Sequence, residues 1–521
     1  MTAPSHVRAP RPFNVSLPQH ESLVHMLLAA VEAQPDHPAV IFEQQRITYA
    51  ELGRAAAGLA NRLESAGVKR GERVILLMAN SIEMDVALMA VMATCAQVAP
   101  VNPFLTLAEL GRQLGDMSAR AIVCDKLSEE KAAAVAAQFG IPTRITLGAG
   151  GVTLDAWKAD AALKLDPARL PTLDDIALLL FTGGSTGVPK GVNHTHRGLL
   201  YSILQHVTVW PCKFGEERYL NVAPMFHIWG LAYSTWVPIF THGTLVMVPR
   251  YDADKVVQGL ADHKITVFAG GPAPIYMGLL ASPVFANADL SHLRYCPSGG
   301  APCPEELHRE WLEKTGQPIL EGWGMTEGAP FCLNPYDGKR KLLSVGNPVP
   351  GTELQVVDLE DGERVLPLGQ RGEFRVRGPQ MMTGYRNQPE ETARTLRDGW
   401  VYTGDIGYVD EDGFVFLVDR KKDMVIVGGF NVYPREVDEV LFKHPKIREA
   451  ATVGKRDPRL GEVLIAFVVL DAGATLTENE FFDYCKTEMV KYKRPVEVRF
   501  VEALPKTGTN KINRRALREQ V

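Results

Sequence analysis

The sequence lacks the marks of several protein classes. Its seven cysteines are scattered over 521 residues, without a Cys-x-x-Cys pair and without a His/Cys cluster at zinc spacing. This pattern favours a reducing compartment and argues against a structural metal. The longest apolar run, residues 86–96, is too short to cross a bilayer, and residues 1–19 are rich in proline without an apolar signal core. We therefore expect a cytoplasmic protein with no transmembrane segment, while contact with a membrane surface stays open.

A strong excess of charge is also missing. The net charge is −5, which gives no reason to expect nucleic acid as a partner. The charge is unevenly spread, because residues 420–521 carry 20 lysines and arginines against 15 acidic residues. A basic C-terminal unit beside a more acidic remainder suits a lid over an anionic substrate, and a solvated surface with the same bias would look alike.

The length and the hydrophobic pattern predict several domains of the α/β class. A chain of 521 residues is too long for one core. In the first two thirds of the chain, apolar runs of strand length alternate with amphipathic helices, which predicts doubly wound, mostly parallel sheets. We expect a flexible arm over residues 1–20 and a large domain over 21–419, with a β-rich subdomain over about 352–419. A small, mobile α+β domain is expected over 420–521.

A glycine-rich loop follows the apolar run at residues 176–180. Glycines let a backbone approach an anion closely, successive N–H groups form an anion-binding nest, and a lysine adds a compact positive charge. The loop lacks the Gly-Lys-Ser/Thr order of a Walker loop, because Lys190 precedes Gly191. A plain turn with a solvated lysine is the alternative to a polyphosphate cradle. The candidate phosphate-binding residues are Thr182, Gly183, Gly184, Ser185, Thr186, Gly187 and Lys190.

Further motifs follow this loop along the chain. They occupy residues 223–227, 298–302, 321–327, 402–405, 418–423, 427–434 and 505–512. Each has an ordinary explanation when taken alone, such as a buried histidine, a tight turn or a basic surface segment. Together and in this order, they resemble the adenylate-forming superfamily of acyl-CoA synthetases, firefly-type luciferases and peptide-synthetase adenylation domains. The resemblance is closest to bacterial medium- to long-chain fatty acid–CoA ligases.

The resemblance implies an ATP site. Trp323, where the family usually has tyrosine, would stack on adenine, and Thr326 would bond the α-phosphate. Glu327 would ligate Mg²⁺, which prefers carboxylate and phosphate oxygens. Lys511 would bridge the substrate carboxylate and the α-phosphate. The implied catalytic residues are thus Lys511, Thr326, Glu327 and His227. The other implied contacts with ATP or AMP are Gly299, Gly300, Ala301, Gly322, Gly324, and, on the ribose, Asp405 and Arg420.

The resemblance also implies a pocket for the acid beside His227. The glycine edges at 298–300 and 322–324 would leave room for a chain. The bulky Trp229 and Trp236 instead favour a short or ring-shaped acid, since their indoles would shorten a tunnel or suit a ring. The implied pocket residues are His227, Trp229, Leu231, Gly300 and Gly324.

The last motifs imply a CoA route and a hinge. Gly428 and Gly429 would let the pantetheine arm pass close to the backbone, and Lys422 would be the hinge between the domains. Two positions depart from the usual family pattern. Gly183 stands where serine is common, and Asn510 stands where glycine usually precedes the catalytic lysine.

The predicted activity is ATP-dependent ligation of a carboxylic acid to CoA, with ATP, Mg²⁺ and CoA required. A medium- or long-chain fatty acid is the expected substrate. The alternatives are an aryl or alicyclic acid–CoA ligase, an adenylation enzyme that loads a carrier protein, and a degenerate homologue that only binds nucleotide. The expected partners are small molecules, and the oligomeric state stays open, with a homodimer among the options.

Overall fold

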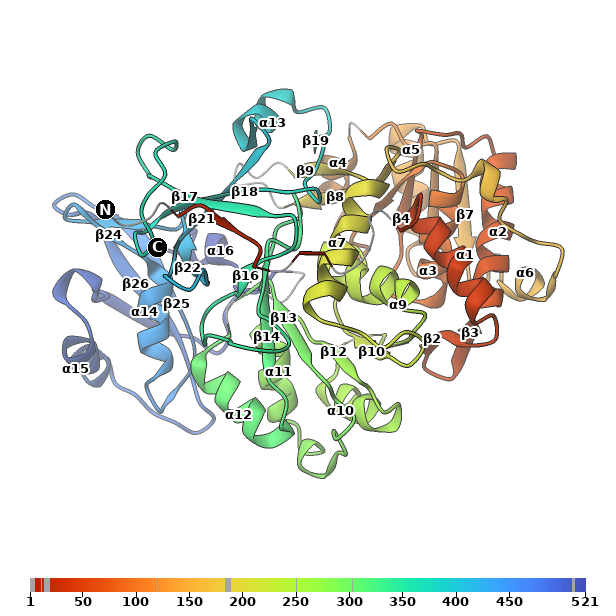
Figure 1. The fold of residues 1–521 in the computed structure, drawn as a ribbon. Coiled ribbons are helices and arrows are strands. Elements are labelled where there is room, and N and C mark those ends of the chain that lie inside the picture. Colours follow the sequence, from red (N-terminus) through yellow and green to blue (C-terminus); the bar gives the residue numbers. More distant parts are fainter. Residues whose placement is uncertain are drawn as a thin grey trace.

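The computed structural model describes residues 5–10, 12–13, 19–115, 117–182, 189–249, 251–301, 303–507 and 511–521. Figure 1 shows a large part built from several sheets and a smaller C-terminal part, drawn in blue, at one end. The predicted α/β class is confirmed. Within these residues, no helix is both long and apolar enough to span a bilayer. The cytoplasmic location, the membrane-surface contact and the homodimer stay predictions.

The first sheet of the large domain carries the glycine-rich loop. Its strand order is β19-β9-β8-β5-β4-β6-β7. The strands from β8 to β7 run parallel to one another, whereas β9 and β19 are antiparallel additions at one edge. Their bounds are β4 Arg73–Leu77, β5 Gln97–Pro100, β6 Ala121–Asp125, β7 Thr143–Leu147, β8 Ile176–Thr182, β9 Lys190–Thr195 and β19 Gly384–Tyr385.

A second, mostly parallel sheet has the order β12-β10-β11-β2-β3, with β3 antiparallel at its edge. The doubly wound pattern is thus divided between two sheets. Their bounds are β2 Pro38–Phe42, β3 Gln45–Thr48, β10 Arg218–Asn221, β11 Thr244–Met247 and β12 Val267–Ala269. A capping box begins the helix after β3: Thr48 Oγ1 accepts from the N–H of Glu51, and the Glu51 carboxylate accepts from the N–H of Thr48.

Two short parallel strands carry the central glycine motifs. They are β13 (Cys296–Gly299) and β14 (Ile319–Trp323), which pair in register with Gly299 opposite Gly322. β15 (Cys332–Leu333) and β16 (Asn347–Pro348) complete this sheet in antiparallel fashion.

The helices of the large domain cover these sheets (Figure 1). They are α1 Leu23–Ala33, α2 Tyr49–Ser65, α3 Ile82–Ala93, α4 Leu107–Leu114, α5 Glu129–Phe139, α6 Asp155–Ala159, α7 His196–Val209, α8 Ile228–Leu231, α9 Val237–Phe240, α10 Ala253–Asp262, α11 Ala273–Leu280, α12 Glu305–Thr315 and α13 Pro389–Thr395. A π-helical turn, Ala232–Trp236, joins α8 to α9. Such turns are often found at functional sites.

The β-rich subdomain contains an N-terminal strand that the sequence pattern did not predict. Its strands are β1 Val7–Arg8, β17 Glu353–Val357, β18 Gly372–Arg377, β20 Leu396–Arg397, β21 Trp400–Val409 and β22 Val415–Arg420. β1 pairs antiparallel with β17, and the buried Ser5 Oγ donates to the carbonyl of Val356 at 3.3 Å. The expected flexible arm is therefore wrong for residues 5–8, because the edge of β17 supplies backbone groups that pair with them.

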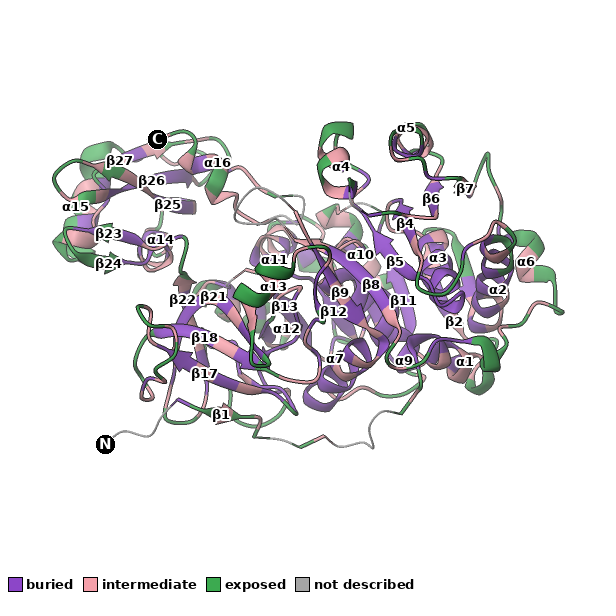
Figure 2. Ribbon diagram, turned by 90° about the horizontal axis from the view of Figure 1, so that it is seen from above, coloured by how far each residue is buried: buried purple, intermediate pink, exposed green. Residues whose placement is uncertain are grey.

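The C-terminal domain follows β22 and has its own core. Its sheet contains β23 Val425–Val427, β24 Phe430–Val432, β25 Ile447–Asp457, β26 Gly461–Leu470 and β27 Glu497–Phe500. Its helices are α14 Pro434–Phe442, α15 Glu478–Glu488 and α16 Arg514–Arg518. Figure 2 shows buried strands inside both parts of the molecule and exposed residues on the outer helices α4, α6 and α15. The two cores are separate clusters, which suits a unit able to move as a body.

Candidate active site

The predicted phosphate loop joins two antiparallel strands. Thr182 ends β8, Lys190 begins β9, and the two residues are partners in the ladder. The candidates Gly183, Gly184, Ser185, Thr186 and Gly187 lie outside the described residues. The ladder fixes the backbone of Lys190 at the base of the loop.

Lys190 lies in a chain of contacts that leads to the predicted magnesium ligand. Its Nζ is 2.5 Å from Glu391 Oε2 and 5.0 Å from the centre of the Tyr385 ring. The Tyr385 hydroxyl donates to Glu327 Oε1 at 2.7 Å. Burial and the Glu327 charge raise the pKa of Tyr385, so this hydroxyl keeps its proton. The sequence reasoning named neither Glu391 nor Tyr385 as a site residue, because their links to Lys190 and Glu327 depend on contacts that only the fold creates.

His194 of β9 holds the segment that carries Thr326 and Glu327. Its Nε2 donates to the carbonyl oxygen of Thr326 at 2.7 Å. Burial lowers the pKa of His194 to about 4, so the imidazole is neutral and can donate from one nitrogen only. The strand that begins at Lys190 thus also positions the predicted contacts to the α-phosphate and Mg²⁺.

The predicted ribose contacts form a cluster with Trp323. Asp405 and Arg420 are partners across β21 and β22, with Arg420 Nε 3.1 Å from Asp405 Oδ1. The indole N–H of Trp323 donates to the other oxygen of Asp405 at 2.8 Å. The Trp323 ring packs against Phe331 and Phe374 and is only 6% exposed. Stacking on adenine stays a prediction, and the observed contact gives the indole a different role, which is to hold Asp405.

Lys511 of the C-terminal domain reaches the large domain at Gly300. A Cβ built on Gly300, whose φ is +84°, would lie 3.0 Å from Lys511 Cε and 3.2 Å from its Nζ, so glycine makes room for the lysine. Burial and the nearby Arg420 lower the pKa of Lys511 to about 8. Burial and the Lys511 charge lower the pKa of His227 to about 3, and its Nδ1 accepts from the N–H of Trp229 at 3.2 Å. The structure therefore brings Lys511, Gly300 and a neutral His227 together.

The glycine edges on the acid side are occupied by other side chains. A Cβ on Gly299 would lie 2.8 Å from Trp229 Cζ3, and one on Gly322 would lie 2.5 Å from Leu333 Cδ2. The expectation that these edges leave room for an acyl chain is wrong, because the missing side chains admit Trp229 and Leu333 instead.

Two predicted pocket residues contact protein rather than an open wall. A Cβ on Gly324 would lie 2.9 Å from Ala329 Cβ, so the turn that follows fills the space at this glycine. Leu231 is fully buried in the core of the large domain. His227, Trp229 and Gly300 remain as the predicted pocket residues that lie together beside Lys511.

The predicted hinge residue lies near the ribose contacts, because the charges of Arg420 and Asp405 act on Lys422, whereas the predicted CoA glycines lie in the C-terminal sheet. Lys422 follows β22, and burial lowers its pKa. Gly428 and Gly429 form the turn between β23 and β24 with φ of +57° and +87°. A Cβ on Gly429 would meet nothing within 4 Å, so this turn faces open space.

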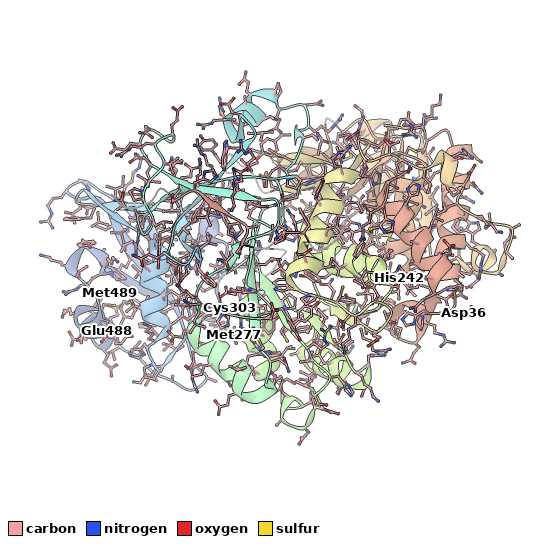
Figure 3. The ribbon with its side chains drawn as sticks, in the orientation of Figure 1. Asp36, His242, Met277, Cys303, Glu488 and Met489 are labelled. Atoms are coloured by element: carbon pink, nitrogen blue, oxygen red, sulfur yellow. The ribbon has the colours of Figure 1, made fainter. Side chains whose placement is uncertain are left out.

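Three potential metal ligands meet behind the strands that carry the glycine motifs. Cys303 lies where the large domain faces the C-terminal domain (Figure 3), and its sulfur, His308 and Glu321 lie within 4.8 Å of one another. These groups already satisfy one another: Glu321 pairs with His308 at 2.9 Å and accepts from the N–H of Cys303 at 3.2 Å. We interpret the cluster as a clamp between β14 and the segment after β13.

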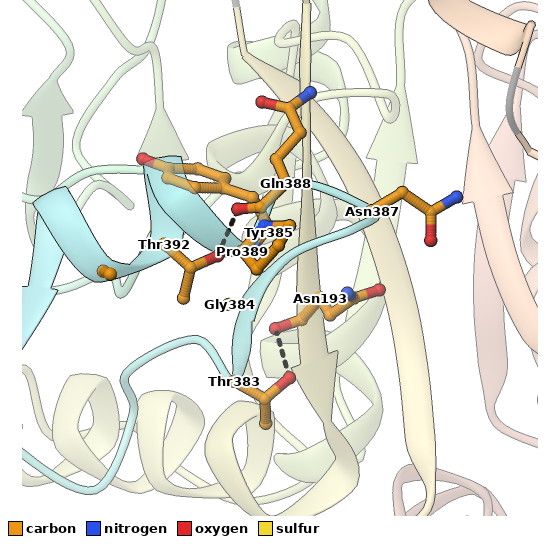
Figure 4. Close-up of a pocket in the computed structure, with 9 residues that line it drawn as sticks. Asn193, Thr383, Gly384, Tyr385, Asn387, Gln388, Pro389 and Thr392 are labelled. Carbon is orange, nitrogen blue, oxygen red and sulfur yellow. Dashed lines mark hydrogen bonds between the residues drawn. The ribbon is translucent and has the colours of Figure 1, made fainter.

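An open pocket of about 410 Å³ lies on the outer side of Tyr385 (Figure 4). Its walls come from β9, β19 and α13, and the N–H of Tyr385 donates to Thr392 Oγ1 at 2.9 Å. Tyr385 thus separates this surface pocket from Glu327.

Comparison with known proteins finds relatives that align with nearly the whole chain. The chain is 34% identical over 540 residues to a long-chain-fatty-acid–CoA ligase of Bacillus subtilis (strain 168), with 98% of this chain and 96% of the relative covered. It is 38% identical over 481 residues to a feruloyl-CoA synthase of Amycolatopsis sp, covering 92% and 94%. The crystal structure of ATP-bound MatB from Rhodopseudomonas palustris matches with a TM-score of 0.89 and 34% identity, covering 96% of this chain and 98% of that one.

Two sequence profiles match in the same order as the two parts of the structure. The profile described as AMP-binding enzyme matches residues 27–386, and the profile of the AMP-binding enzyme C-terminal domain matches residues 436–511. The first spans more than half of the chain and includes the phosphate loop, His227 and Glu327. The second ends at Lys511. The chain belongs to the AMP-binding enzyme family.

Proposed function

We propose that this protein is an ATP-dependent acid–CoA ligase that works through an acyl-adenylate. The observation that carries the proposal is the position of Lys511 over Gly300, beside a neutral His227 and near Arg420. This position brings a mobile positive charge to the end of the strand where the nucleotide and the acid would meet.

In the first step, a carboxylate oxygen of the acid attacks the α-phosphorus of ATP, and pyrophosphate leaves. Two anions must approach each other, and the ammonium of Lys511 screens their repulsion. Asp405 and Arg420 hold the ribose hydroxyls, while Lys190 and the phosphate loop bind the leaving phosphates. His227 lies beside the carboxylate as a neutral group and adds no competing charge.

Glu327 suits the expected Mg²⁺. The Glu327 residue is 6% exposed, and the Tyr385 hydroxyl donates a hydrogen bond to one of its carboxylate oxygens. Mg²⁺ binds one or two protein carboxylates together with phosphate oxygens, and a bound ion would neutralise charge on the phosphates. Tyr385 would hold Glu327 in place for this role.

In the second step, the CoA thiol attacks the acyl carbonyl carbon, and AMP leaves. Lys511 occupies the Gly300 edge in the described arrangement, whereas Gly429 of the same domain faces open space. We infer that the C-terminal domain turns about Lys422 between the steps and brings Gly428 and Gly429 to the pantetheine arm.

Two classes of acid are open to this reaction. A medium- or long-chain fatty acid is supported by the name of the Bacillus subtilis relative, which aligns with 98% of this chain. An aromatic acid is supported by the name of the feruloyl-CoA synthase, which is 38% identical.

Pyrophosphate release tests the reaction. The purified protein is supplied with ATP, Mg²⁺, CoA and a panel of linear and aromatic acids, and acyl-CoA is measured in parallel. We expect acid-dependent release of pyrophosphate and formation of a thioester. Release of pyrophosphate without thioester would favour a carrier-loading enzyme, and no release with any acid would contradict the proposal.

A further inference from the structure

Trp229 closes the space directly behind the carboxylate site. A Cβ on Gly299 would lie 2.8 Å from the Trp229 ring, and one on Gly271 would lie 3.7 Å from its Nε1. Lys511 docks over Gly300, the next residue along the strand, and consecutive Cα atoms are about 3.8 Å apart. An acyl chain that extends from the carboxylate would therefore meet the indole within its first few carbons.

The Tyr233 ring packs beside the Trp229 ring. The two ring centres are 5.0 Å apart, and the Tyr233 side chain is 1% exposed. Among the described residues, neither the Tyr233 hydroxyl nor Trp229 Nε1 has a hydrogen-bond partner. A buried polar group without a partner costs about 1–3 kcal/mol, so a bound acid that offers a hydrogen-bonding oxygen to these two neighbouring residues would recover part of that cost.

The groups around Tyr233 are neutral or already paired. The His206 ring is 5.5 Å from the Tyr233 ring, and its Nδ1 donates to the carbonyl of Ser202 at 2.8 Å. Burial lowers the pKa of His206 to about 4, which keeps it uncharged. Arg294, over the neighbouring Tyr295 ring, is paired with Glu217. A second ionised carboxylate on the substrate would find no free cation among these residues.

We propose that the acid is compact, with a flat ring seated against Trp229 and a neutral hydroxyl, ether or carbonyl oxygen bound by Tyr233 and Trp229 Nε1. This inference rests on the proposed function and decides between its two substrate classes. Trp229 is the residue that excludes long linear acids, and Tyr233 is the residue that selects the polar substituent. The helix that begins after His227 and continues into the π-helical turn Ala232–Trp236 places Tyr233 one turn after Trp229.

The experiment compares four ligase preparations on matched acids. The acids are cinnamate and p-coumarate, which differ by one phenolic hydroxyl, and the linear series from butyrate to hexadecanoate. The preparations are the unaltered protein, Tyr233→Phe, Trp229→Ala and the control Tyr276→Phe, whose hydroxyl already donates to Pro297 at 2.7 Å. Pyrophosphate release gives kcat/KM for each acid, and thermal unfolding gives Tm for each variant.

We expect the unaltered protein to prefer p-coumarate over cinnamate and over every linear acid. Tyr233→Phe should reduce the ratio of kcat/KM for p-coumarate over cinnamate by about tenfold, because one hydrogen bond to the substituent is lost. Trp229→Ala should raise the efficiency for decanoate relative to p-coumarate by at least about tenfold, because the path behind the carboxylate opens. Tyr276→Phe should lower Tm and leave the acid ratios unchanged, whereas Tyr233→Phe should not lower Tm, since it breaks no bond within the protein.

Three results would overturn the inference. Efficiency of the unaltered protein that rises with chain length up to dodecanoate would show that Trp229 does not close the path. An equal loss on cinnamate and p-coumarate in Tyr233→Phe would show that its hydroxyl does not bind the substituent. Pyrophosphate release with none of the acids would overturn the proposed function, and this inference with it.

Discussion

The nucleotide half and the acid half of the site differ in how the side chains that would face their ligands are paired, although the buried Nδ1 of His194, which supports Thr326, also has no partner among the described residues. On the nucleotide side, Lys190 pairs with Glu391, Tyr385 donates to Glu327, and Trp323 donates to Asp405. On the acid side, Tyr233 and Trp229 bury polar atoms that have no partner within the described residues.

We infer from this difference that the nucleotide half carries out the reaction common to all acids, whereas the acid half selects which acid binds. Groups that hold one another in place are ready for charge that develops during the reaction, because little reorganisation is needed. Buried polar groups without a partner favour a ligand that forms a hydrogen bond with them and disfavour a ligand that leaves them unpaired. We therefore expect changes on the nucleotide side to act on every acid alike, and changes on the acid side to act on some acids only.

Lys511→Ala gives the largest expected effect and tests whether the nucleotide half acts alike on all acids. Loss of the ammonium over Gly300 should slow acyl-adenylate formation by about 10²–10³-fold with linear and aromatic acids alike. Conversion of supplied acyl-adenylate to thioester should be spared, and the two half-reactions can be measured separately. An equal loss in both halves would contradict the role given to Lys511.

Trp323→Phe tests whether the indole acts through Asp405. The loss of its hydrogen bond to a charged group should raise the KM for ATP by about tenfold while kcat changes less. The effect should shrink with a dideoxyribose analogue of ATP, because the ribose hydroxyls no longer need Asp405. Trp400→Phe is the control, because it removes an indole of β21 that packs against Arg375 and Arg377. A loss of the same size with the analogue would favour stacking on adenine instead.

The pH dependence of adenylation distinguishes the charged Lys511 from the neutral His227. The pKa of Lys511 is lowered to about 8, and its protonated form is the active one, so the rate should fall as the pH rises through about 8. His227, with its pKa lowered to about 3, stays neutral over the same range and should not contribute a second inflection. Single-turnover rates between about pH 6 and 10 measure this, and Lys511→Arg should shift the fall to higher pH. A rate independent of pH would exclude Lys511 as the titrating group.

Tyr385→Phe should have the smallest effect. It removes the hydrogen bond to Glu327 but keeps the ring near Lys190. We therefore expect the Mg²⁺ concentration needed for half-maximal activity to rise a few-fold, while the preference among acids stays unchanged. Titration of activity against Mg²⁺ measures it, with Tyr408→Phe, whose ring stacks on Phe416, as the control. If this variant ranked the acids differently by kcat/KM, the nucleotide half would also affect acid selectivity, which would contradict the proposed division of roles.

The sequence by itself determined the features that depend on neighbours along the chain. Local spacing predicts the capping box at Thr48 and the strand before the glycine-rich loop, and the order of the motifs predicts the family. These features could be predicted because each depends on a short segment or on a motif shared with a family.

Only the tertiary structure decided which distant side chains meet. Glu391 pairs with Lys190 across 201 positions, and Asp405 accepts from Trp323 across 82. The absence of a side chain at Gly299 suggests open space in the sequence, but in the fold it admits Trp229. Packing fills such gaps because protein interiors are dense, and the residue that fills them comes from whichever segment the fold brings near. The reaction could therefore be predicted from the motifs, whereas the shape of the acid site depends on the folded chain.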